Sequence, residues 1–159
     1  MAIWLWKLGS ANQPKKLNPS KCLAVACLAA AIAVPGLAMS ADDQPQRWEA
    51  YSPERLSQLR AEGKPVFINL TADWCITCLA NERVALSSAA FYQALDTNDI
   101  TYLKGDWTDS DPEITALLNE YQRSGVPLYL LFPKGEGKAQ ILPQILLETT
   151  VIELLTSVK

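Results

Sequence analysis

The chain has 159 residues, 49% of them hydrophobic and 19% charged, which is enough for one packed domain and too little for two. It contains no histidine, which excludes Ser-His-Asp and Cys-His catalysis and every zinc site that uses histidine. Residues 1–40 carry four lysines and no acid, whereas residues 41–159 hold the other ten bases and all seventeen acids, a net charge of −7. Such an acidic body lacks the clustered basic residues that bind nucleic acid, so no nucleic-acid partner is expected.

The first forty residues have the charge pattern of a membrane-directed segment. The run Cys22–Met39 contains no charge and lies between the four lysines and Asp42, an arrangement that keeps the basic end in the cytoplasm. A helix over 22–39 would rise about 27 Å, slightly less than the hydrocarbon core of a bilayer. A transmembrane anchor fits this pattern, and so does a cleaved signal with small residues at Ala38–Ala41. A helix buried in a soluble core is a third alternative, disfavoured by the one-sided charge.

The chain after residue 40 begins with a polar stretch that predicts a linker, at residues 41–52, before a domain at residues 53–159. Ser52 is a suitable N-cap and Pro53 is tolerated in a first helical turn. These residues predict a short helix that ends at Gly63.

The rest of the domain alternates apolar runs with segments of helical periodicity, each bounded by turn residues. The predicted elements are a buried strand at 65–70, helices at 75–86 and 89–95, a strand at 100–103, a helix at 111–121, strands at 128–132 and 139–142, and a helix at 150–158. Gly135 and Gly137 separate the last two strands, which are therefore expected to pair antiparallel. The pattern predicts an α/β fold with a parallel start and an antiparallel hairpin.

The segment Trp74-Cys75-Ile76-Thr77-Cys78 is the motif that carries chemistry, at the junction of the 65–70 strand and the following helix. The N-terminus of a helix offers free N–H groups and the positive end of the helix dipole, which stabilise a thiolate. A thiolate is the attacking species in disulfide exchange, so Cys75 is expected to be a nucleophile. Cys78 lies one helical turn later and can resolve a mixed disulfide formed on Cys75.

A Cys-x-x-Cys pair has three other possible uses. A structural zinc site needs four ligands, but the only other cysteines, Cys22 and Cys27, lie in the N-terminal apolar run. A permanent structural disulfide would be unusual across so short a loop beside a tryptophan. Two thiolates can hold a soft ion such as Cu(I), so a copper-binding module remains an alternative.

The segment Ala72–Cys78, followed about fifty residues later by Gly125-Val126-Pro127, resembles the thioredoxin superfamily. Within it, the chain is most similar to the C-terminal thioredoxin-like domain of DsbD-type and ScsB-type thiol:disulfide interchange proteins. The resemblance covers about residues 48–159 and extends to Asp106-Trp107-Thr108. It implies a thioredoxin-like fold, with a central mixed sheet flanked by helices and preceded by one N-terminal membrane or signal helix. It also favours an anchor over a cleaved signal.

The resemblance implies a role for each residue that matches the family's site. Cys75 would attack and Cys78 would resolve. Pro127 would be a cis-proline facing the two thiols, which exposes the Val126 backbone to a substrate strand. Trp74 would shield the thiol pair, unless it is an ordinary core tryptophan. We expect Trp74, Val126 and Asp73 to lie on the substrate side of the site.

One position departs from the family pattern. Asn69 stands six residues before Cys75, where many members of the family have a buried acid. An amide cannot accept or release a proton, so the usual proton path of the resolving thiol is altered. Glu82 matches an acid that the resemblance implies tunes the thiol, although it could instead be a solvated surface residue. Asp73 or Glu82, acting through water, could replace the missing acid.

The sequence thus predicts a periplasm-facing thiol:disulfide oxidoreductase held at the inner membrane, or released into the periplasm if the leader is cleaved. No charge occurs in Ile76-Thr77 to favour a strong oxidant, so a reductase is expected. The resemblance implies a membrane-embedded electron donor of the DsbD or CcdA type, and periplasmic disulfide proteins, such as isomerases or cytochrome c maturation factors, as acceptors. A monomer without an organic cofactor or metal is expected. A Cu(I)-binding module and a disulfide oxidase are the alternatives.

Overall fold

The computed structural model describes residues 46–158. The predicted membrane or signal segment at 22–39 lies outside these residues. Among residues 46–158, no helix has both the length and the apolar character needed to cross a membrane. The strands are β1 (Glu49–Ala50), β2 (Val66–Thr71), β3 (Thr101–Asp106), β4 (Leu128–Phe132) and β5 (Gln140–Ile141). The helices are α2 (Pro53–Ala61), α3 (Ile76–Ala85), α4 (Ala89–Thr97), α5 (Pro112–Glu120) and α6 (Glu148–Ser157).

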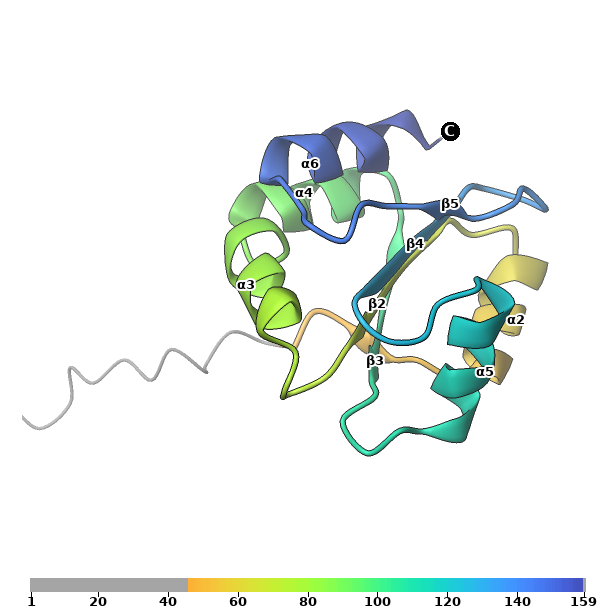
Figure 1. Ribbon diagram of the computed structural model, residues 1–159. Helices are drawn as coiled ribbons and strands as arrows, with labels where there is room; N and C mark the ends of the chain where they lie inside the picture. Colours follow the sequence, from red (N-terminus) through yellow and green to blue (C-terminus); the bar gives the residue numbers. More distant parts are fainter. Residues whose placement is uncertain (1–45, 159) are drawn as a thin grey trace, which may run out of the picture. The chain divides into compact units, whose positions relative to one another are not determined.

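The strands form one mixed sheet in the order β1-β3-β2-β4-β5 (Figure 1). β3 is parallel to β1 and β2, whereas β4 is antiparallel to β2 and β5. The parallel start and the antiparallel hairpin are therefore both confirmed. Together with the flanking helices, this sheet makes the thioredoxin-like α/β fold that the sequence predicts.

The central strand β2 is buried along its whole length and contributes to two cores. Phe67 packs with residues of α3, α4 and α6 on one side of the sheet. Val66, Ile68 and Leu70 pack with α2 and α5 on the other side. Because successive side chains of a strand point to opposite faces, one short apolar run supports both helical layers (Figure 1).

Side-chain caps mark the starts of α2 and α5, and the cap of α2 is the predicted one. The Ser52 side chain accepts a hydrogen bond from the Arg55 N–H, and Pro53 occupies the first turn of α2. The Asp111 side chain caps α5 in the same way, with Pro112 in the first turn. These local signals explain why both helices begin where the sequence predicts.

β3 extends three residues beyond the predicted strand, which ends at Leu103. Lys104 and Gly105 interrupt the apolar pattern and hide this extension from the sequence. The structure shows why Gly105 is there: a Cβ at this position would lie 2.6 Å from the Leu70 Cδ2 and 3.1 Å from the Ile114 Cδ1. Its missing side chain lets the sheet approach α5 closely.

β1 lies within residues 41–52, which the sequence assigns to a linker. Glu49 and Ala50 pair with Leu103 and Lys104 of β3, and the Tyr51 N–H donates to the Lys104 carbonyl at 2.9 Å. The linker assignment does not hold for these two residues. Both residues are exposed, so no alternation of apolar and polar side chains marks this strand in the sequence. The strand forms through backbone hydrogen bonds to a distant segment of the chain.

Candidate functional site

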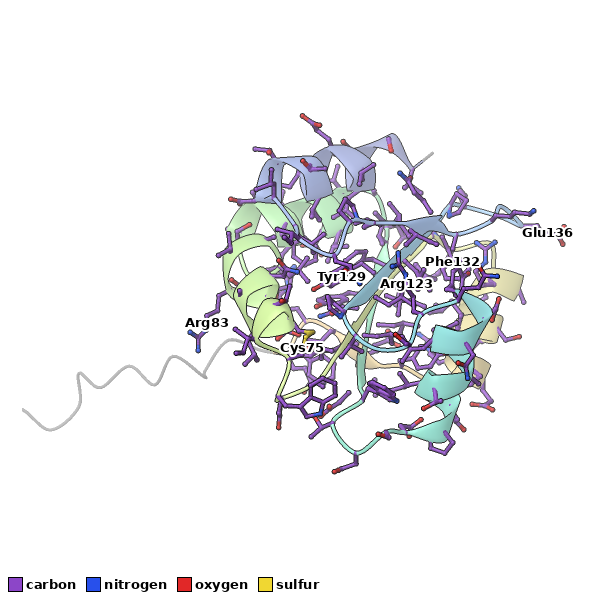
Figure 2. All side chains as sticks on the ribbon, in the orientation of Figure 1. Cys75, Arg83, Arg123, Tyr129, Phe132 and Glu136 are labelled. Atoms are coloured by element: carbon purple, nitrogen blue, oxygen red, sulfur yellow. A yellow bond between two sulfur atoms is a disulfide. The ribbon has the colours of Figure 1, made fainter. Side chains whose placement is uncertain are left out.

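Cys75 and Cys78 lie where β2 passes into α3, and they form a disulfide with a Cα–Cα distance of 5.2 Å (Figure 2). Cys75 is the N-cap of α3, and its Sγ accepts a hydrogen bond from the Cys78 N–H at 3.2 Å. Cys75 is 7% exposed, whereas Cys78 is fully buried. Only Cys75 can be reached from solvent, at the helix end that stabilises a thiolate.

The Val126–Pro127 peptide bond is cis, as the resemblance implies. Leu128 pairs with Leu70 in the antiparallel ladder of β4 and β2, so the residues before β4 lie beside the residues after β2. Val126 packs against the small cluster of Ala72, Cys75 and Cys78. The structure therefore brings Val126, the residue before the cis bond to Pro127, to the disulfide from a segment about fifty residues away.

Trp74 is 56% exposed beside the disulfide and is not a core tryptophan. Its ring lies 6.0 Å from the ring of Trp107, and its Nε1–H donates to the Thr108 carbonyl at 3.2 Å. Asp73, the preceding residue, is exposed. Ile76 and Leu79 are also exposed, so the start of α3, which Cys75 caps, carries apolar side chains that solvent reaches.

Glu82 is half-buried and has two polar partners, so it is not a solvated surface residue. Its Oε1 accepts from the Asn69 Nδ2 at 3.0 Å, and its Oε2 accepts from the Lys104 Nζ at 3.0 Å. Asn69 is fully buried and also donates to the Tyr102 hydroxyl at 3.0 Å. Burial raises the pKa of Tyr102 and keeps its phenol neutral. Glu82 follows Cys78 by four residues and therefore lies on the same side of α3.

Asn81 also holds α3 in place, and the sequence gives no sign of this. Its Nδ2 donates to the Tyr129 hydroxyl at 2.9 Å and to the Gln144 carbonyl at 2.7 Å, and its Oδ1 accepts from the Leu146 N–H at 3.1 Å. Burial also raises the pKa of Tyr129 to about 12. This buried amide ties α3 to β4 and to the segment that leads into α6.

The sequence also predicts no role at the site for Lys104 or Thr108. Thr108 belongs to a segment that the resemblance singles out, but that resemblance assigns it no contact. Lys104 lies on β3, but the predicted strand ends at Leu103, one residue before it. Within residues 46–158, no group of three or more histidine, cysteine, aspartate or glutamate side chains is arranged to hold a metal ion.

A family model described as thioredoxin-like matches residues 47–134. Among curated proteins, the chain is 38% identical over 81 residues to the thiol:disulfide interchange protein DsbD of Klebsiella pneumoniae, which covers 51% of this chain and 13% of that protein. It is 35% identical over 86 residues to DsbD of Escherichia coli K12, covering 54% of this chain and 14% of that protein. The chain thus spans a small part of the length of these relatives.

Solved structures agree with the sequence comparison. The reduced C-terminal domain of DsbD from Neisseria meningitidis matches with a TM-score of 0.53 and 27% identity, over 65% of this chain and 89% of that one. Its oxidised form matches with a TM-score of 0.57 and 24% identity, over 70% of this chain and 99% of that one. The described domain is therefore similar to one whole domain of a longer protein.

Proposed function

This chain belongs to the thioredoxin-like family, and on that premise we propose that it is a protein-disulfide reductase acting through Cys75 and Cys78. The observation that carries the proposal is the asymmetry of the pair. Cys75 caps α3 and is reachable, whereas Cys78 is fully buried behind it. An attacking thiol and a protected resolving thiol need this arrangement.

The proposed reaction moves two electrons and two protons from the dithiol to a substrate disulfide. The Cys75 thiolate attacks one substrate sulfur, a mixed disulfide forms, and the other substrate sulfur leaves as a thiolate. Cys78 then loses its proton and attacks the Cys75 Sγ, which closes the disulfide described above and releases the second substrate thiolate. The two substrate thiolates take up the two protons.

The loop before β4 provides the place for the substrate in this proposal. Val126 lies against the disulfide cluster, and the cis bond to Pro127 shapes the loop. An extended substrate segment would pair with the Val126 backbone, as in other cases where a peptide adds to a sheet edge. The exposed Trp74, with Asp73, would border that segment on the opposite side.

The direction and location of the reaction rest on the DsbD relatives and on the leader. We place the domain on the periplasmic side, where disulfides persist, with residues 1–40 as its membrane or signal segment. Electrons would arrive from a membrane-embedded donor of the DsbD or CcdA type and leave to periplasmic disulfide proteins, including factors for cytochrome c biogenesis. The relatives' names, thiol:disulfide interchange protein, support the chemistry of this proposal.

The reduction potential of the Cys75–Cys78 pair tests whether the protein acts as a reductase or as an oxidant. The full chain with Cys22→Ala and Cys27→Ala, in detergent, leaves only Cys75 and Cys78 to titrate in dithiothreitol or glutathione buffers. We expect a potential near or below about −200 mV, on the reducing side of the range for this family. A value near about −120 mV would make the protein an oxidant and overturn the proposed direction.

The Glu82→Gln substitution tests whether Glu82 tunes the reactive thiol. A carboxylate opposes a nearby thiolate, and its loss also leaves the Lys104 ammonium unneutralised. Both effects favour the thiolate, so the pH midpoint of Cys75 alkylation should fall by about half a unit. Lys104→Gln should move the midpoint upward. Glu120→Gln, on the exposed surface of α5, is the matched control, and an unchanged midpoint in Glu82→Gln removes Glu82 from the mechanism.

A further inference from the structure

Thr108, in the loop between β3 and α5, holds both residues that precede Cys75. Its Oγ1 accepts a hydrogen bond from the Asp73 N–H at 2.9 Å, and its carbonyl accepts from the Trp74 Nε1–H at 3.2 Å. One residue therefore binds the backbone of the first and the side chain of the second.

Asp106 fixes the orientation of Thr108. Its Oδ1 accepts from the Thr108 N–H at 2.8 Å and also from the Thr108 hydroxyl. A hydroxyl has one proton to donate. Because that proton is committed to Asp106, the lone pairs of Oγ1 face the Asp73 N–H. Asp106 thus holds the Thr108 hydroxyl in the orientation in which it accepts from the Asp73 N–H.

The segment that Thr108 binds is a tight turn with few other attachments. On its inner side, the Cys75 N–H donates to the Ala72 carbonyl at 3.0 Å, and Cys75 then caps α3 through its sulfur. On its outer side, Asp73 and Trp74 are both exposed. Apart from the contact of the Trp74 ring with Trp107, packing therefore contributes little to their position, and the two bonds to Thr108 hold them beside the loop that follows β3.

We propose that Thr108 is a positioning residue for the thiol–disulfide reaction, an inference that rests on the proposed function. It acts through Asp73 and Trp74: by fixing this turn, it holds the Cys75 Sγ at the N-terminus of α3 and Trp74 beside it. A thiol that leaves this place loses the helix N–H groups that favour its thiolate and the aligned approach to an incoming disulfide.

Two substitutions at position 108 separate the hydroxyl from the rest of the side chain. Thr108→Val keeps the branched shape and removes the hydroxyl, whereas Thr108→Ser keeps the hydroxyl. The probe is oxidised glutathione mixed with the reduced full chain carrying Cys22→Ala and Cys27→Ala. Cys75 forms a disulfide with one glutathione, the other leaves as a thiolate, and Cys78 then releases the first. The second-order rate constant and its pH midpoint are measured.

We expect Thr108→Val to lower this rate constant by roughly threefold to tenfold, the range of one hydrogen bond, and to raise the pH midpoint. Thr108→Ser should restore both values to within about twofold of the parent. The control is Thr156→Val, since the Thr156 hydroxyl binds only within α6, to the Glu153 carbonyl at 2.9 Å. An unchanged rate in Thr108→Val, or equal slowing in Thr108→Ser, overturns the proposal.

A second variant covers the case in which Thr108→Val does not fold. Asp106→Ala removes the acceptor that orients the hydroxyl and should slow the reaction in the same sense, and an unchanged rate again overturns the role of Thr108. Failure of the proposed function has a different signature. In that case the parent protein, with Thr108 intact, exchanges with no disulfide at all.

Discussion

The Cys78→Ser variant is expected to accumulate a covalent disulfide complex with its substrate, whereas Cys75→Ser forms none. Cys75 is the only sulfur of the pair that solvent reaches, so it makes the first bond. When both variants also carry Cys22→Ala and Cys27→Ala, the loss of Cys78 leaves no second cysteine in the chain to resolve that bond. Both variants should reduce a substrate disulfide no faster than buffer without protein. Non-reducing gel electrophoresis after acid quenching and thiol capping detects the complex.

The control for this experiment is the parent with Cys22→Ala and Cys27→Ala, which should turn over without accumulating a complex. A complex on Cys75→Ser and none on Cys78→Ser would reverse the roles of the two thiols. The same proteins test the copper alternative. A parent that binds one Cu(I) tightly but exchanges with no disulfide would be a metal-binding module, and the reductase proposal would fall.

Asn81→Ala is expected to lower the free energy of unfolding by about 2–4 kcal/mol, because it leaves two buried polar groups and one part-buried carbonyl unpaired. The affected groups are the Tyr129 hydroxyl, the Gln144 carbonyl and the Leu146 N–H. Urea unfolding of the full chain, followed by circular dichroism, measures the change. The loss should also loosen the attachment of α3 to the segment before α6.

Two further substitutions make this result specific. Asn119→Ala, on the exposed side of α5, should change the unfolding free energy by less than about 0.5 kcal/mol. Tyr129→Phe removes one of the three partners and should cost about 1 kcal/mol. In the double variant the two losses should not add, because they share a bond. A loss in Asn81→Ala no larger than in Asn119→Ala would contradict the network.

The features that the sequence predicts well depend on local patterns. The strand Leu128–Phe132 has the predicted bounds, and α3 begins one residue after Cys75, because an uninterrupted apolar run and a cap leave little choice of structure. The cysteine pair is equally plain, since its spacing and its place after a buried strand are visible along the chain.

The features that the sequence missed depend on distant partners. β1 exists because β3 offers backbone groups to pair with. Asn81 and Thr108 are polar residues whose roles come from backbone groups that only the folded chain brings near them. The sequence does not distinguish a thiol-tuning Glu82 from a solvated one. The bonds of Glu82 to Asn69 and Lys104, which belong to two neighbouring strands, exclude the solvated alternative. Such contacts carry no periodicity to detect.

The register between β2 and β4 has a consequence for how the site matures as the chain folds. The cap of α3, in which the Cys75 Sγ accepts from the Cys78 N–H, joins residues that are neighbours in the sequence. The place of Val126 beside the disulfide, which the proposed function assigns to the substrate, needs two strands far apart in sequence to pair in one register. Local contacts cost less loop-closure entropy than distant ones. In the proposed function, a chain whose sheet is incomplete would therefore have the α3 cap of the thiol site before it has the Val126 loop that receives the substrate.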